Sequence, residues 1–297
     1  MKKVFKRFAS FAMALTIAGS GAVITGTFSP NSVGIMTAQA SVIEGKAVSD
    51  YSLYTGGVNT DLTIKRKPDN KSASMGVLKK GTPVVIYEVN NGFGRIDKGW
   101  IQLRYVTVDL NTVFKDIKNI KNIKAVEFVF KNQFMVGKPS NDSKKNTFAP
   151  KETIKRSDIV SVIYNMAGKP YTHYERIFKD VTFDKPCKYA VTWAYRNDIV
   201  AGYANGNFGI NDDVTIEQVA QMLFKYAKLC GYDTSFTKGE SSKYKQSDWA
   251  KKSGAVDWAV HQKILTKANT NSSYNATQKA SRELCADMVK NLMENHL

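Results

Sequence analysis

Side chains that commonly perform covalent or metal chemistry are scarce in this chain of 297 residues. The three histidines are His173, His261 and His296, and the three cysteines are Cys187, Cys230 and Cys285. None of the histidines lies in an H-E-x-x-H pattern or a comparable metal-binding spacing, and three cysteines cannot supply a four-cysteine zinc site. No G-x-S-x-G sequence provides a serine nucleophile. We therefore expect a protein that is not an enzyme and that uses no metal or other cofactor.

The composition is that of a globular protein with an anionic partner. Apolar residues make up 43% and charged residues 23%, which is enough for packed cores in two or more domains. The net charge of +17 favours nucleic acid, an acidic surface polymer or a membrane as the partner. Because the number of cysteines is odd, at least one is unpaired within the chain, and any of the three pairs, or none, could form.

Residues 1–40 have the pattern of an export signal peptide. Basic residues lie between Lys2 and Arg7, an apolar stretch runs from Phe8 to Ile24, and Ala38-Gln39-Ala40 provides a small-x-small cleavage site. The alternative is an uncleaved membrane anchor, and no later apolar run approaches the roughly 18 residues that a membrane span needs. Cleavage would remove four cations and no acids, which lowers the net charge from +17 to +13. For an exported chain of this charge we expect an acidic surface polymer, and no nucleic acid, as the partner.

Residues 48–108 carry the signals of a small all-β domain. Leu62-Thr63-Ile64-Lys65 alternates apolar and polar side chains, and Val84 to Val89 is rich in β-branched residues. Asn90-Asn91-Gly92 supplies a tight turn. Five such short strands within about sixty residues predict a small barrel.

This segment resembles a bacterial SH3 domain. The resemblance rests on Leu62-x-Ile64-x-Arg66-x-Pro68, on Gly99-Trp100-Ile101 and on Tyr105-Val106. It implies an SH3-like barrel that contacts peptidoglycan in the cell wall or serves as a spacer. Trp100 and Tyr105 could then form an aromatic face for a ligand, and the alternative is that both pack in the core of the barrel.

From residue 114 onward the sequence repeats. The segments Ala125–Val129, Ala190–Ala194 and Ala255–Ala259 align with a spacing of 65 residues each time. Each repeat has the pattern of a helix, a loop and a second helix. In repeat two, Gly202 is expected to end the first helix, and Asp212 or Asp213 is expected to cap the second. The repeats therefore predict a mainly α-helical part that follows the β-rich segment.

The repeats resemble S-layer homology domains, which usually occur as a set of three. The three predicted repeats are residues 114–168, 176–231 and 245–297. The family features are the loop Gly202–Phe208 and the start of each second helix, at Lys155-Arg156-Ser157-Asp158, Thr215-Ile216-Glu217-Gln218 and Ser281-Arg282-Glu283-Leu284. Phe148, Phe208 and Tyr274 each lie eight positions before the second residue of these starts. The resemblance implies a pseudo-threefold unit with a central helical bundle.

The resemblance also implies a ligand, because grooves between neighbouring repeats would bind an anionic, pyruvylated secondary cell-wall polysaccharide. Arg156 and Arg282 occupy the arginine position of the family, where a guanidinium can receive the carboxylate of a pyruvate ketal through two parallel hydrogen bonds. Further implied ligand residues are Trp193 and Trp258, which could pack on the sugar, and Gly202 and Gly206, which would let the backbone approach it. The alternatives are that both tryptophans belong to the core and that both arginines are solvated in a first helical turn.

The repeats depart from the family pattern at several positions. Ile216 replaces the arginine in repeat two, Phe128 replaces a tryptophan in repeat one, and Lys267 replaces a glycine in repeat three. Repeat one has a lysine-rich loop at residues 139–145, and repeat three keeps only Ser247-Asp248-Trp249 of the F-x-D start. We therefore expect one or two competent grooves rather than three.

Together these features favour a secreted, non-catalytic protein that its repeats hold on the cell wall. The SH3-like module would add a second wall contact, and two contacts in one chain raise retention through effective concentration. Three alternatives stay open. They are display of an SH3-like module that binds a protein partner, an enzyme or regulator of wall turnover, and a structural surface-layer subunit.

Overall fold

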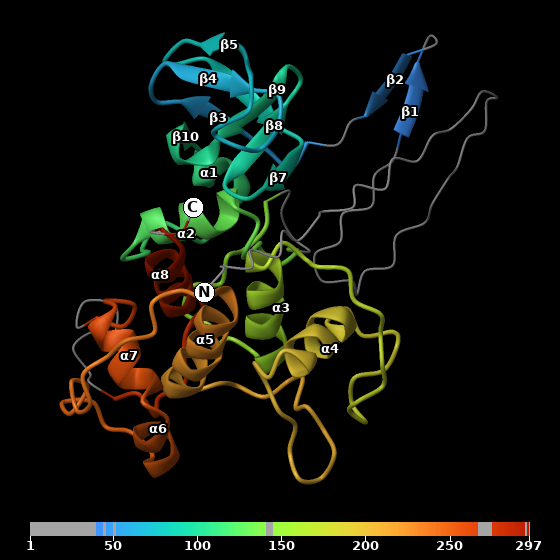
Figure 1. Ribbon diagram of the computed structural model, residues 1–297. Helices are drawn as coiled ribbons and strands as arrows, with labels where there is room; N and C mark the ends of the chain where they lie inside the picture. Colours follow the sequence, from blue (N-terminus) through green and yellow to red (C-terminus); the bar gives the residue numbers. More distant parts are fainter. Residues whose placement is uncertain are drawn as a thin grey trace, which may run out of the picture.

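The computed structural model describes residues 52–140, 145–266, 275–294 and 296, together with the backbone of two short strands, β1 (Ala40–Ile43) and β2 (Lys46–Ser49). Apart from Ala40, the predicted signal segment lies outside the described residues. Figure 1 shows β-sheets at one end of the molecule and helices at the other. Within the described part, none of the helices combines the length and the apolar character needed to cross a membrane.

Two antiparallel sheets make up the β-rich part, which we call the β module (residues 54–107). Its elements are β3 (Tyr54–Val58), β4 (Leu62–Lys65), β5 (Ser74–Leu78), β6 (Pro83–Ile86), β7 (Glu88–Asn90), β8 (Phe93–Ile96), β9 (Gly99–Gln102), a 3-10 turn (Leu103–Tyr105) and β10 (Val106–Thr107). The strand orders are β10-β3-β6 and β5-β4-β9-β8-β7. Only Tyr87 separates β6 from β7, so the chain passes from one sheet to the other there. Among the described residues, strand pairing does not close these sheets into the barrel that the sequence predicts.

Local sequence signals explain the strands of the β module. In β4, Leu62 and Ile64 are buried while Thr63 and Lys65 are not, as the alternating pattern predicts. Between β7 and β8, Asn91 and Gly92 have φ angles of 47° and 75°, which is the left-handed pair that a type I′ turn requires. The strand at Leu62–Lys65 and this turn are confirmed, whereas the run from Val84 to Val89 is divided at Tyr87 into β6 and β7, which belong to different sheets.

The C-terminal part is helical, as the repeats predict. Its helices are α1 (Leu110–Val113), α2 (Ile123–Lys131), α3 (Arg156–Met166), α4 (Lys188–Arg196), α5 (Ile216–Cys230), α6 (Asp248–Ser253), α7 (Ala255–His261) and α8 (Arg282–Met293). Helices α2, α4 and α7 carry the 65-residue repeat, and α3, α5 and α8 are the second helices.

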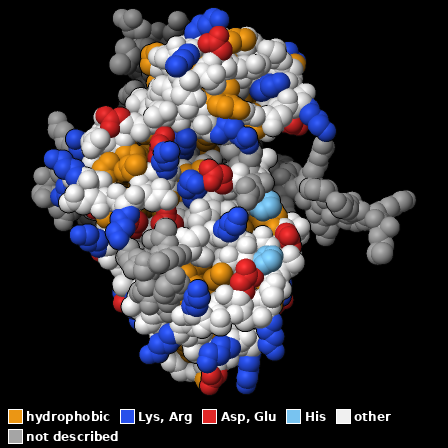
Figure 2. Space-filling model, turned by 90° about the vertical axis from the view of Figure 1, so that its left-hand side faces the viewer, with side chains coloured by type: hydrophobic (Ala, Val, Ile, Leu, Met, Phe, Trp, Pro, Cys, Tyr) orange, Lys and Arg blue, Asp and Glu red, His pale blue; other side chains and the backbone are white. Residues whose placement is uncertain are grey.

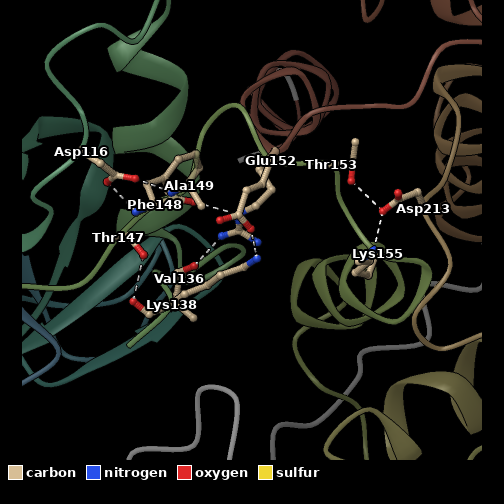
Figure 3. Close-up of polar contacts among 11 residues, drawn as sticks. Asp116, Val136, Lys138, Thr147, Phe148, Ala149, Glu152, Thr153, Lys155 and Asp213 are labelled. Carbon is tan, nitrogen blue, oxygen red and sulfur yellow. Dashed lines mark hydrogen bonds and ion pairs between the residues drawn. The ribbon is translucent and has the colours of Figure 1, made fainter. Parts of the chain in front are cut away.

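The expected ends of two helices were wrong. Helix α4 ends at Arg196, six residues before Gly202, because the chain turns at Asp198 with a φ of 58°. Helix α5 is capped by Thr215 rather than by Asp212 or Asp213, because Thr215 and Gln218 form a capping box. Asp213 instead accepts hydrogen bonds from Thr153 and Lys155 of the first repeat, as Figure 3 shows.

A closed ring of backbone hydrogen bonds joins the three segments that precede the second helices. Ile154 N–H donates to the carbonyl of Ala280 at 2.9 Å, Ala280 N–H to Val214 at 2.9 Å, and Val214 N–H to Ile154 at 3.3 Å. Two residues further on, the N–H groups of Arg156, Ile216 and Arg282 donate to Asp212, Gln278 and Glu152, which connects the repeats in the opposite cyclic order. This arrangement has approximately threefold repetition, and it places the start of each second helix against a segment of another repeat.

The β module is fixed on α2 through a buried polar contact. The hydroxyl of Tyr54 donates to the carbonyl of Lys131 at 2.8 Å, and the Lys131 ammonium donates to the carbonyl of Val106 at 2.7 Å. Glu127 lies 3.6 Å from that ammonium and accepts a hydrogen bond from the N–H of Val108. One hydrophobic core runs through both parts. Residues 109–111 therefore lie in a packed junction between the two parts and contain the start of α1.

Candidate functional site

Arg156 is the first residue of α3, and its side chain crosses to the loop of the second repeat. Its Nε donates to the carbonyl of Phe208 at 2.9 Å and its Nη2 to the carbonyl of Ala201 at 2.5 Å. The guanidinium lies 4.6 Å from the centroid of the Phe208 ring and 5.3 Å from that of Tyr203. Only 8% of Arg156 is exposed. Burial lowers its pKa, and the neighbouring Tyr203 and Asp212 oppose that effect.

Arg282 repeats this geometry on the loop of the first repeat. It is the first residue of α8, its Nε donates to the carbonyl of Phe148 at 2.8 Å, and its Nη2 donates to the carbonyl of Val136 at 2.9 Å. Its exposure is 5%. Figure 3 shows the two acceptor residues side by side. Each arginine therefore holds the loop of a different repeat, and neither is the solvated arginine of the alternative interpretation.

Ile216 is the first residue of α5, the position that Arg156 has in α3 and Arg282 has in α8. Its N–H does not bond to the loop of its own repeat. The loop of repeat two, at Ala201 and Phe208, receives Arg156 from repeat one. Ile216 instead faces the third repeat, where its N–H donates to Gln278. Ile216 therefore belongs to the contact with the third repeat and not to the loop of repeat two. Lys267 and Tyr274, which the sequence places in the third loop, lie outside the described residues.

An aspartate in each of the first two repeats fixes the loop that the arginine contacts. Asp180 accepts backbone hydrogen bonds from Phe208, Gly209 and Ile210 at 2.6, 2.8 and 3.1 Å. Burial alone would raise the pKa of Asp180, but these three bonds favour the carboxylate and lower the pKa overall. Asp116 binds the loop of the first repeat in the same way, through the N–H groups of Phe148 and Ala149 (Figure 3).

The third repeat starts differently from the sequence alignment. Tyr244 is buried and lies eleven residues before Ala255, as the buried Phe114 lies eleven before Ala125. The F-x-D start of repeat three is therefore Tyr244-Lys245-Gln246, and not a remnant at residues 247–249. Gln246 replaces the aspartate and donates to Ser241.

A hollow of about 620 Å³ lies beside the second loop. Its lining includes Tyr203, the amide residues Asn205 and Asn207, the cation Lys185 and the acidic residues Asp180 and Asp212. We call it the Arg156 groove, because Arg156 lies against the Tyr203 ring. Tyr203 is 43% exposed. Hydrogen-bond donors and acceptors next to such an aromatic residue suit the hydroxyl groups and the C–H faces of a sugar.

Gly209 is needed for this lining. Its φ is +83°, and a Cβ there would lie 2.4 Å from Asp212 Oδ2 and 2.5 Å from the Tyr203 ring. The two glycines that the sequence singles out have other roles. A Cβ on Gly202 would lie 2.2 Å from the ring of Phe178, and Gly206 adopts a positive φ in the turn. Gly202 therefore serves packing against Phe178, and neither Gly202 nor Gly206 belongs to the lining.

Arg282 has different neighbours from Arg156. Lys138 forms an ion pair with Glu152, and the backbone of Lys138 pairs with Thr147 through hydrogen bonds of 2.7 and 3.0 Å (Figure 3). By its equivalence to the position of the Arg156 groove, we call Arg282 together with Lys138 and Glu152 the Arg282 groove. Neither Lys138 nor Glu152 belongs to a motif, so local sequence patterns do not reveal them, and the motifs do not mark Tyr203 or Asp212 as site residues either.

The two tryptophans on first helices are core residues in this structure. Trp258 is fully buried, its Nε1 donates to the carbonyl of Asp233 at 3.1 Å, and its ring packs on Phe224. Trp193 is 7% exposed and packs on Tyr164. Neither ring presents an open face on which a sugar could stack, so the core interpretation describes their positions.

The two aromatic residues of the β module lie on different elements. Trp100, on β9, is partly exposed and stands in register with Lys65 on β4 and Arg95 on β8. Tyr105 lies in the 3-10 turn after β9 and is 36% exposed. Trp100 is therefore not the core residue that the alternative interpretation expected.

The cysteines of this chain are not paired with one another, and the described residues contain no cluster of metal-binding side chains. Cys187, Cys230 and Cys285 are all free thiols, and burial raises the pKa of Cys187 to about 11 and that of Cys285 to about 12. Within the described ranges, no group of three or more His, Cys, Asp or Glu side chains is placed to hold a metal ion.

Comparison with known proteins gives one match. The family model of the S-layer homology domain matches residues 177–220. No curated protein matches the chain. The matched segment contains Asp180, the second loop and every residue that lines the Arg156 groove. Residues 177–220 therefore form an S-layer homology domain, a module that generally binds cell-wall polymers.

Proposed function

We propose that this is a secreted, non-catalytic cell-wall protein that binds an anionic secondary cell-wall polysaccharide in the Arg156 groove. One observation carries the proposal. The polar hollow beside Tyr203 is built wholly from the segment that matches a polymer-binding family. The export signal pattern in residues 1–40 supports secretion.

The side chains of the groove suit a sugar that carries a carboxylate. Lys185 provides a cation at the hollow, and the buried Arg156 adds positive potential behind Tyr203. The carboxylates of Asp180 and Asp212 also line the hollow, where backbone N–H groups bind Asp180 and the Tyr203 hydroxyl binds Asp212. Asn205 and Asn207 can bind hydroxyl groups, and the Tyr203 ring can pack on a sugar face. A pyruvate ketal is such a carboxylate, and we propose it as the charged group of the ligand.

The surface charge supports capture of a polyanion. Figure 2 shows Lys and Arg side chains spread over both the β module and the helical part, with Asp and Glu among them. A net charge of +17, or +13 after signal cleavage, attracts an anionic polymer at long range and makes the association sensitive to salt.

The three-repeat arrangement forms part of the proposal. The hydrogen-bond ring of Ile154, Val214 and Ala280 and the two equivalent arginines support a pseudo-threefold unit of three S-layer homology repeats. We further propose that the β module is SH3-like and contacts peptidoglycan through Trp100. Because Lys65 and Arg95 flank Trp100, a wall contact fits this face better than an uncharged protein partner does. The hydrogen-bonded junction at Lys131 would favour one position of this second contact relative to the grooves.

The test is binding of residues 41–297 to purified cell-wall sacculi, either complete or stripped of secondary polymer by acid, over a series of salt concentrations. Tyr203→Ala removes the exposed ring of the groove, and we expect it to weaken binding about tenfold or more. Tyr171→Ala is the matched control, because Tyr171 is 93% exposed and lies outside the groove. Equal binding to stripped sacculi, or a Tyr203→Ala variant that binds like the control, would refute the proposal.

A further inference from the structure

Lys138 and Glu152 hold the same positions in the first repeat as Tyr203 and Asp212 hold in the second. Lys138 follows Gly137, which packs on Phe114 as Gly202 packs on Phe178. The carbonyl of Glu152 accepts the N–H of Arg282 at 2.9 Å, and the carbonyl of Asp212 accepts the N–H of Arg156 at 2.8 Å. The two grooves therefore share a backbone and differ in the side chains in front of the arginine.

In the Arg282 groove, these side chains form an internal ion pair. The Glu152 carboxylate binds the Lys138 ammonium, as Figure 3 shows, and it also contributes to the electrostatic field at the Arg282 guanidinium. In the Arg156 groove, the residue at the lysine position is the uncharged Tyr203, whose hydroxyl is hydrogen bonded to Asp212. Of these two grooves, the Arg282 groove is the one in which the carboxylate in front of the arginine forms an ion pair with a lysine.

We propose that Glu152 occupies the anion position of the Arg282 groove, so that this groove accepts a carboxylate-bearing sugar only when the ligand displaces Glu152. This inference rests on the proposed function, because it assigns unequal strengths to the two grooves. An attached carboxylate competes with a free ligand at a high effective concentration. The side chains of Lys138 and Glu152 are 39% and 59% exposed, so water and salt weaken their ion pair and a ligand can break it.

The consequence is a division of labour between the grooves. The Arg156 groove binds first, and the Arg282 groove adds a weaker contact where the polymer offers many carboxylates. Removing the charge of Glu152 while keeping its size should free Lys138 for the ligand, while Arg282 stays bound to the loop carbonyls. The variant Glu152→Gln does this at a largely exposed side chain, so it leaves the fold intact.

The experiment is a calorimetric titration of residues 41–297 with a methyl hexoside that carries a 4,6-linked pyruvate ketal, and with its methyl ester as the neutral probe. We expect Glu152→Gln to strengthen the weaker of two sites for the acid about tenfold and to leave binding of the ester unchanged. The double variant Glu152→Gln, Lys138→Ala should lose most of this gain. The matched control is Glu175→Gln, because the side chain of Glu175 is 58% exposed and pairs with Arg196 at 2.7 Å.

The outcomes separate the two proposals. If the wild-type chain binds the acid and Glu152→Gln binds it no better than Glu175→Gln does, the internal competitor is refuted and the proposed function stands. A gain that persists without Lys138, or that extends to the ester, would also refute it. If no chain binds the acid, both proposals fail.

Discussion

The two arginine grooves have the same backbone framework and different chemistry. Arg156 and Arg282 each start a helix and each donate to two carbonyls of another repeat. In front of them, one groove has Tyr203 and the other a Lys138–Glu152 ion pair. The difference shows that the arginine and the side chains in front of it have separate roles. The arginine joins repeats, and the side chains in front of it decide what the groove can bind.

The largest effect should come from removing an arginine. We expect Arg156→Ala and Arg282→Ala each to lower the free energy of unfolding by about 2–4 kcal/mol, because two buried carbonyls lose a charged donor. The measurement is urea denaturation of residues 41–297. Arg196→Ala, whose side chain is 45% exposed, is the control and should cost less than about 0.5 kcal/mol. Unchanged stability in the two arginine variants would mean that the arginines serve the ligand alone.

Gly209 allows a sharper test of the Arg156 groove. We expect Gly209→Ala to cost about 1–3 kcal/mol and to weaken polymer binding, because its positive φ disfavours a side chain and the new Cβ would press on Asp212 and Tyr203. Gly239→Ala is the matched control, because its φ is +85° and a Cβ there has no neighbour within 4 Å. Comparing the two by denaturation and by sacculus binding separates backbone strain from disturbance of the groove. Equal effects in both assays would contradict the lining role of Gly209.

Local signals in the sequence explain which parts of the fold were predictable. The alternation in Leu62–Lys65 and the Asn91-Gly92 turn depend on neighbouring residues, and the 65-residue period can be seen in the sequence itself. The strand, the turn and the repeated helices lie where these signals predict them. Helix ends were less predictable. Asp198 takes the left-handed conformation that the sequence analysis assigned to a glycine, and Thr215 outcompetes the nearby aspartates as a cap.

The site was only partly predictable, because its contacts cross between repeats. The register of the second helices identified Arg156 and Arg282, but nothing local shows that Arg156 contacts the loop of repeat two. The two tryptophans lie at equivalent positions of their repeats, each next to an alanine. A tryptophan that packs in the core and one that stacks on a sugar can both have this sequence pattern. Lys138 and Glu152 lie 14 positions apart in an irregular segment, so their pairing appears only in three dimensions.

The helices that carry the arginines also differ in charge, and this gives the smallest and most specific prediction. By the same register, Ser161 on α3, Gln221 on α5 and Asp287 on α8 are equivalent, so only the helix of Arg282 has a titratable group at this position. Burial raises the pKa of Asp287 to about 6; the hydrogen bond from Asn122 and the charge of Lys290 lower it, and Glu283 adds to the increase.

Because the pKa of Asp287 is higher in the folded chain than its ordinary value of 3.8, the folded state holds the proton more tightly between about pH 4 and pH 6. The contribution of Asp287 to stability therefore falls as the pH rises through this window. We expect Asp287→Asn to be more stable than the wild-type chain by about 1–2 kcal/mol at pH 7 and to show no advantage at pH 4. Urea denaturation of both chains from pH 4 to pH 8 measures the difference. A difference that does not change with pH would mean that Asp287 is not the titrating group. A larger difference in an Asn122→Ala background would show that the hydrogen bond from Asn122, at the contact between α2 and α8, limits the rise of the Asp287 pKa.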